Sequence, residues 1–192
     1  PNDFVTEYAG NYIYEAGALK FFNQPEGYVE KAGATYKYVY QYKDHLGNIR
    51  LAYKNIGTTT SPSLRIEEQH HYYPFGLKQQ YSAADARMNN ISNHKYGFNG
   101  KEEQNEKGLK WLDFGARNYD AAIGRWMNID PLAEEMRRHS PYNYAFNNPM
   151  FFIDPDGMSP IATLMNGGQI NSDDIENSAF GAQNFGGYTM GP

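Results

Sequence analysis

The chain has 192 residues, with 17 lysines and arginines against 22 aspartates and glutamates, and a formal net charge of −5. It has no cysteine, which excludes disulfides, thiolate catalysis and cysteine zinc sites. Its basic residues form no stripe, so nucleic acid is not an expected partner, and no apolar run approaches the ~20 residues that span a bilayer. The 17 tyrosines, 11 phenylalanines and 19 glycines instead suit aromatic strands joined by glycine turns.

Residues 4–56 are predicted to form a meander of strands. In 8–14 and 34–42, aromatic or apolar residues alternate with small or polar ones, which is the period-two pattern of a half-buried strand. Gly-Asn pairs within this region indicate turns. A polar stretch at 57–63, broken by proline, indicates a hairpin loop.

A second loop is expected at about 82–94, where residues 83–88 have the composition of a single helical turn. Neither loop carries a catalytic pattern. Strands punctuated by glycine are then expected to resume from Tyr96 to Trp126.

Residues 131–139 predict a short helix of about two turns. Leu132, Met136 and His139 recur at the spacing of one helix face. Proline is tolerated at the first position of a helix, and Asp130 precedes it as an N-cap.

Several short motifs occur along the chain in one order. GRWMNIDP at 124–131 and NNPMFFIDPDGM at 147–158 closely resemble the signature that closes the core of RHS-repeat (YD-repeat) proteins. That core is the shell-forming part of polymorphic toxins and of the C component of Tc toxin complexes. Further motifs resemble the family in the same order: YQYKDHLGNIR at 40–50, YYPFG at 72–76, YGFNGKE at 96–102 and LDFGARNYD at 112–120.

The resemblance implies an all-β fold, a spiralling antiparallel strip of strands that forms part of an RHS shell. A short helix and a plug segment are expected near the C-terminus. Residues 1–158 would be the RHS core, comprising the C-terminal end of the shell and the plug. Residues 159–192 contain no lysine or arginine and little apolar material, so a poorly ordered tail or the start of a variable cargo is expected there.

In that family the closing segment is an aspartyl self-cleavage site, and its two Asp-Pro motifs fall on Asp130 and Asp154. Hydrolysis by carboxylates needs two acids close together, one neutral and one ionised, and these are 24 positions apart (154 − 130). Asp156 is a third candidate, because an Asp-Pro-Asp-Gly turn can point both carboxylates inward. Arg125, which matches the arginine of the family's G-R-F segment, is expected to orient a carboxylate.

One position departs from the family pattern. Ala133 stands where the first motif, Asp-Pro-x-Gly, usually has glycine. An alanine with positive φ would be strained by about 1 kcal/mol or more, whereas alanine favours the expected helix.

The resemblance implies that this module encapsulates a C-terminal polypeptide, a toxin-like cargo. It would release that cargo by a single intramolecular aspartyl cleavage between Met158 and Ser159. Two alternatives remain open. One is a non-catalytic shell scaffold, in which the aspartates only form turns, and the other is a cell-surface adhesin that binds carbohydrate through its tyrosines.

The implied partners are an upstream RHS shell, the C-terminal cargo or toxin segment, and a cognate immunity protein. The implied location is secreted or at the cell surface, with any export signal upstream of this piece. No cofactor or metal is expected, because the adjacent His70 and His71 would face opposite sides of a strand.

Overall fold

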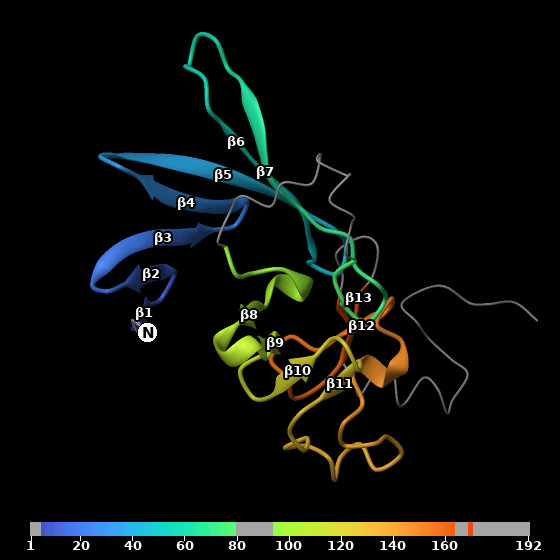
Figure 1. The fold of residues 1–192 in the computed structure, drawn as a ribbon. Helices are drawn as coiled ribbons and strands as arrows, with labels where there is room; N and C mark the ends of the chain where they lie inside the picture. Colours follow the sequence, from blue (N-terminus) through green and yellow to red (C-terminus); the bar gives the residue numbers. More distant parts are fainter. Residues whose placement is uncertain (1–4, 80–93, 164–168, 171–192) are drawn as a thin grey trace, which may run out of the picture. The chain divides into compact units, whose positions relative to one another are not determined.

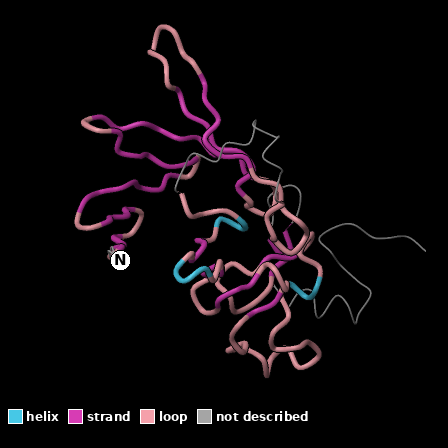
Figure 2. The backbone as a smooth tube through the Cα atoms, viewed as in Figure 1, coloured by secondary structure: helices cyan, strands magenta, loops and turns pink. Residues whose placement is uncertain are grey.

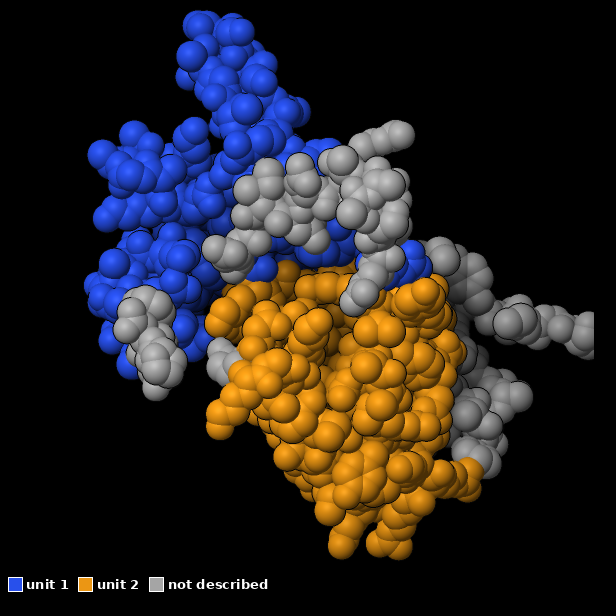
Figure 3. Space-filling model, viewed as in Figure 1, with its two compact units in different colours: residues 1–44, 49–71, 79–94 blue, residues 45–48, 72–78, 95–192 orange. Residues whose placement is uncertain are grey.

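The computed structural model describes residues 5–79, 94–163 and 169–170, and it divides into two compact units (Figures 1 and 3). Unit 1 comprises the described residues of 1–44, 49–71 and 79–94, and unit 2 comprises those of 45–48, 72–78 and 95–192. Strands dominate the regular structure, and short 3-10 turns are the only helical elements of the described residues (Figure 2). The predicted all-β class is confirmed. The helical turn expected at 83–88 lies outside the described residues.

Unit 1 is a seven-stranded antiparallel sheet whose strands pair in the order in which they occur in the chain (Figure 1). The predicted meander and the loop at 57–63 are therefore confirmed, although 8–14 is a hairpin and not one strand. Gly10, Gly17 and Gly33 have positive φ at two-residue turns, as tight hairpins require. The strands are β1 Thr6–Ala9, β2 Tyr12–Glu15, β3 Ala18–Gln24, β4 Gly27–Ala32, β5 Thr35–Lys43, β6 Ile49–Asn55 and β7 Leu64–Gln69.

The two faces of this sheet differ because side chains alternate along each strand. On one face Tyr28, Val39 and Ala52 form a small buried cluster, against which Phe21 packs. The opposite face of β5 carries a row of tyrosines, and three of its four members are exposed. The row is Tyr36, Tyr38, Tyr40 and Tyr42.

A buried ion cluster lies in unit 1. Lys54 Nζ of β6 is 2.5 Å from Glu30 Oε1 and 3.1 Å from Glu67 Oε2, and Arg65 Nε is 2.6 Å from Glu67 Oε1. Burial alone would raise the pKa of Glu67, but the hydrogen bonds from Arg65 and Lys54 outweigh it and hold that pKa below its usual value. The two cations therefore compensate for the burial of the Glu67 side chain.

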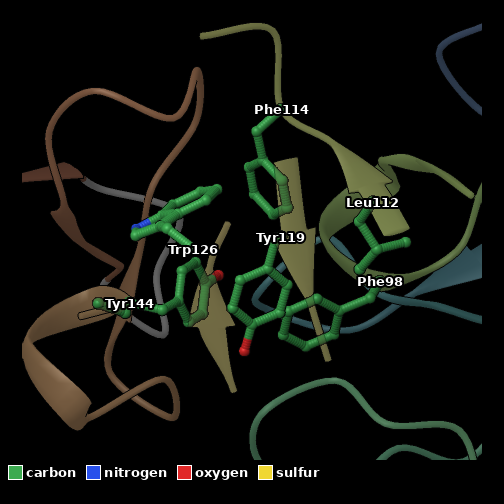
Figure 4. Close-up of a cluster of buried hydrophobic side chains, with 7 residues drawn as sticks. Phe98, Leu112, Phe114, Tyr119, Trp126 and Tyr144 are labelled. Carbon is green, nitrogen blue, oxygen red and sulfur yellow. The ribbon is translucent and has the colours of Figure 1, made fainter. Parts of the chain in front are cut away.

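Unit 2 contains two small antiparallel sheets, with strand orders β11-β10-β9-β8 and β12-β13-β14. Aromatic side chains from several of its elements pack into one core, in which the rings of Tyr119 and Tyr144 lie 4.5 Å apart (Figure 4). The elements are η1 Phe98–Gly100, β8 Glu102–Gln104, η2 Glu106–Gly108, β9 Trp111–Asp113, β10 Asn118–Asp120, β11 Arg125–Trp126, η3 Ala145–Asn147, β12 Phe152–Ile153, β13 Ile161–Thr163 and β14 Gln169–Ile170.

The prediction of a helix at 131–139 is wrong. These residues form consecutive turns, with bonds from Ala133 N to Asp130 O and from His139 N to Met136 O, each three residues apart. A helix this short is marginal by itself. It would also separate its ends by roughly 13 Å, whereas the backbone N–H of Asp130 donates to the carbonyl of Pro141 at 3.2 Å. A helix over these residues could not bring Asp130 and Pro141 within hydrogen-bonding distance, so this bond excludes it.

Candidate functional site

Arg117 is a buried arginine immediately before β10, and its guanidinium joins two carboxylates. Nη1 lies 2.7 Å from Asp130 Oδ2, and Nη2 lies 2.9 Å from Asp154 Oδ2. Cζ stands over the indole of Trp126, 4.2 Å from the ring centroid, which adds a cation–π contact. The two aspartates that the sequence pairs therefore meet on one side chain.

Asp154 is fully buried at the start of the turn that follows β12. Its Oδ1 accepts the backbone N–H groups of Gly157 at 2.8 Å and Met158 at 3.0 Å. Gly157 has φ of +80°, and a Cβ there would lie 3.0 Å from Arg117 N. The glycine thus allows this tight turn, and its carbonyl accepts Arg117 Nε at 2.5 Å.

Burial raises the pKa of Asp154, because desolvation disfavours the carboxylate. The charge of Arg117 and the backbone N–H of Gly157 act in the opposite direction without cancelling this effect. Asp154 therefore holds a proton more readily than an aspartate in water does.

Asp130 is also nearly buried, with 7% of its surface exposed. Its Oδ1 accepts the backbone N–H of Leu132 at 2.8 Å, which is the local bond expected of a capping aspartate. Pro141 O accepts Asp130 N, and Arg117 Nη1 lies 3.5 Å from the same oxygen. Both ends of the 130–141 excursion are thus fixed beside Arg117.

Asp156 lies in the same turn as Asp154, but it is exposed. Its Oδ1 accepts Met158 N at 3.0 Å, so two carboxylates share that N–H. Its own carbonyl accepts Ala116 N at 3.0 Å. The preceding carbonyl, of Pro155, accepts Lys101 Nζ at 2.5 Å.

No protein-family model matches the chain. Toxin subunit YenC1 of Yersinia entomophaga is 31% identical over 116 residues, which are 58% of this chain and 11% of that protein. Toxin subunit YenC2 of the same organism is 31% identical over 122 residues, 60% of this chain and 12% of that protein. Salivary gland surface protein 1 of Aedes aegypti is 29% identical over 131 residues, 67% of this chain and 3% of that protein.

Solved structures share the fold. The TcdB2-TccC3 crystal structure covers 80% of this chain at a TM-score of 0.58 and 22% identity, and this chain covers 8% of it. The same assembly without its hypervariable C-terminal region gives a TM-score of 0.57. These similarities agree with the resemblance of the chain to RHS-repeat proteins. The chain spans about a tenth of the length of the toxin subunits it matches.

The arginine that contacts the two aspartates is not the one expected from the sequence. Arg125 lies on β11, where its Nη1 donates to Asn147 Oδ1 at 2.7 Å, and Arg117 contacts the aspartates. The sequence carried a signal for Arg117, since it is the one basic residue of the LDFGARNYD motif, in which Leu112, Phe114 and Tyr119 are buried. A charge amid buried apolar positions needs a buried partner.

Proposed function

We propose that this segment closes an RHS shell around a C-terminal polypeptide and cuts the chain after Met158 by intramolecular aspartyl proteolysis. The observation that carries the proposal is the simultaneous contact of Arg117 with Asp130 and Asp154. Asp154 also holds the N–H of Met158, so one of the acids is bound to the residue that precedes the proposed cut.

The reaction adds one water across the Met158–Ser159 amide. The ionised acid takes a proton from the water, whose oxygen bonds to the Met158 carbonyl carbon. The neutral acid gives a proton to the Ser159 nitrogen as the C–N bond breaks, which yields a carboxylate and a free amine. General acid and general base must therefore be two groups in opposite protonation states.

The environments of the two acids support an assignment. Asp154 is the neutral acid, because burial raises its pKa. Asp130 is the base, and its Oδ2 lies 2.7 Å from Arg117 Nη1. Arg117 is the positioning residue, which fixes both carboxylates and the Gly157 carbonyl through separate nitrogens.

The proposal is tested by intact mass of the 192-residue chain and by sequencing the new N-terminus. We expect a fragment that begins at Ser159, formed with first-order kinetics that do not depend on protein concentration, since the reacting groups share one chain. Asp130→Asn and Asp154→Asn should abolish it. The matched control is Glu135→Gln, an exposed acid of unit 2, which should cut at the wild-type rate.

A cut at an Asp-Pro bond would indicate acid lability, and a rate that rises with concentration would indicate a protease acting in trans. If Asp130→Asn and Asp154→Asn both cut at the wild-type rate, these two aspartates are not the catalytic pair.

A non-catalytic scaffold is the second candidate function. One observation favours it: Asp154 accepts three hydrogen bonds, from Arg117, Gly157 and Met158, so its role in fixing the turn is sufficient to explain it. A chain that stays intact through Met158-Ser159 while Asp154→Asn loosens the turn would support the scaffold. If immobilised polysaccharide retained the intact chain, that result would support glycan binding by the tyrosine row of β5 instead.

The remaining partners follow from the proposed shell. We infer an upstream RHS strand strip, a cargo or toxin segment, and an immunity protein that would bind that cargo, and a location that is secreted or at the cell surface. The names of the two Yersinia relatives, toxin subunits, support a role beside partner subunits. No helix among the described residues is long and apolar enough to cross a membrane.

A further inference from the structure

Lys101 has a place in unit 2 that the proposed chemistry does not yet use. Its backbone is fixed at the end of η1, where its N–H donates to Phe98 O at 2.9 Å and its carbonyl accepts Gly97 N at 3.0 Å. From this fixed point its Nζ reaches the carbonyl of Pro155 at 2.5 Å. A long, mobile side chain thus gains a defined target.

The contact completes a row of donors along the Asp-Pro-Asp-Gly turn. The consecutive carbonyls of Pro155, Asp156 and Gly157 accept Lys101 Nζ, Ala116 N and Arg117 Nε in that order. Three carbonyls in series leave the turn little freedom to rotate about its φ and ψ angles. The carbonyl that Lys101 holds belongs to Pro155, the residue next to Asp154.

The ammonium is also held over an aromatic ring in a partly buried place. Nζ lies 5.1 Å from the ring centroid of Phe114, a residue of the aromatic core shown in Figure 4. Burial lowers the pKa of Lys101, and the carboxylates of Asp154, Asp156 and Asp113 offset part of that effect. Its charge therefore acts on the turn that carries the acids.

We propose that Lys101 is a positioning residue for the self-cleavage, which holds the Pro155 carbonyl and sets the charge environment of Asp154 and Asp156. This inference rests on the proposed function. Lys101 takes no part in the bond exchange, because the water, the two acids and the amide already balance the reaction. It acts through the turn that presents Asp154 and Met158.

The test replaces Lys101 by methionine, which keeps the stem over Phe114 and removes the donor and the charge. Misplacing reacting groups by about 1 Å costs on the order of 100-fold, so Lys101→Met should slow the cut by about 10- to 100-fold. Lys101→Arg should recover most of the rate. The control is Lys110→Met, which removes the same charge from an exposed lysine of unit 2 and should cut normally.

The pH–rate profile distinguishes a lysine that acts on the acids through its charge from one that only stabilises the structure. Removing a positive charge makes ionisation of a neighbouring carboxyl harder, so the pKa of Asp154 rises. The limb of the profile that reports Asp154 should move to higher pH in Lys101→Met, and it should not move in Lys101→Arg. A slower rate with an unmoved profile and no recovery by arginine would overturn the inference.

Amide hydrogen exchange gives a readout that does not need cleavage. In the Asp130→Asn background, which should stay uncut, adding Lys101→Met should speed exchange of the Gly157 and Met158 N–H groups at least severalfold. Unchanged exchange overturns the anchoring role. If the wild-type chain is never cut, the proposed function fails and the positioning role falls with it, whereas a normal cut in Lys101→Met defeats only the inference.

Discussion

Replacing Arg117 by methionine should be among the most damaging single changes in unit 2. The side chain of Arg117 is 1% exposed and those of Asp130 and Asp154 are 6% and 0% exposed, so the change strands two carboxyl groups away from water. Removing one partner of a buried ion pair costs about 3–5 kcal/mol. We expect a loss of that size in the free energy of unfolding at pH 7.

The loss should depend on pH, and its direction follows from Asp154. Arg117 holds the pKa of that carboxyl down against the effect of burial, so removing it raises the pKa further above the unfolded value. Between these two values the folded state binds more protons, and stability falls as the pH rises through the folded pKa. Below about pH 4, where unfolded aspartate is also protonated, the electrostatic part of the loss should vanish.

Tryptophan fluorescence during urea unfolding measures this effect in unit 2 alone, because both tryptophans of the chain, Trp111 and Trp126, belong to that unit. Variant and reference are compared in the same covalent state, checked by mass. Arg125→Met is the matched control and should cost less than about 1 kcal/mol, since its bond to Asn147 is exposed. A loss under about 1 kcal/mol for Arg117→Met, or one equal at pH 4 and pH 7, would refute the reasoning.

Three further predictions concern other elements. Lys54→Met should cost about 3 kcal/mol by leaving the buried Glu67 with one cation fewer, whereas Lys20→Met at an exposed pair should cost under about 1 kcal/mol; urea unfolding followed by circular dichroism decides. Gly27→Ala should disrupt the β4–β5 pairing, because its Cβ would lie 2.0 Å from Val39 O, whereas Gly33→Ala, with open space, should cost only about 1 kcal/mol; thermal midpoints compare them. Tyr119→Phe should cost about 1 kcal/mol by losing the bond to Phe75 O, and absorbance at 295 nm should show no phenolate from Tyr119 at pH 11 while the chain is folded, because burial raises its pKa.

The strands of unit 1 were predictable because their signal is local. Alternation within 34–42 predicts β5, and glycines with positive φ mark three of the tight reversals, at Gly10, Gly17 and Gly33. The stretch at 131–139 has the residue spacing of a helix as well, yet it forms turns. There a long-range bond, from Asp130 N to Pro141 O, outweighed a weak local preference.

The meeting of Asp130 and Asp154 followed from the resemblance of two Asp-Pro motifs, and the structure brings both to one guanidinium. The identity of that arginine did not follow. Arg125 and Arg117 both lie in motifs beside strands, and only the three-dimensional path of the chain decides which of them is buried against Trp126. Arg125 is nearer to Asp130 in the sequence, yet Arg117 makes the contact.

The pairing of β12 with β13 has a consequence for what a cut after Met158 would accomplish. β13 lies downstream of the bond, yet Phe152 pairs with Ala162 and Ile153 with Ile161, and Ala162 is fully buried. Cutting would therefore leave two polypeptides joined as neighbouring strands of one sheet. Severing the covalent link and parting the pieces are then separate events, and the second requires a pull or local melting strong enough to peel β13 from β12. A sample cut to completion would still migrate as one particle until it is denatured.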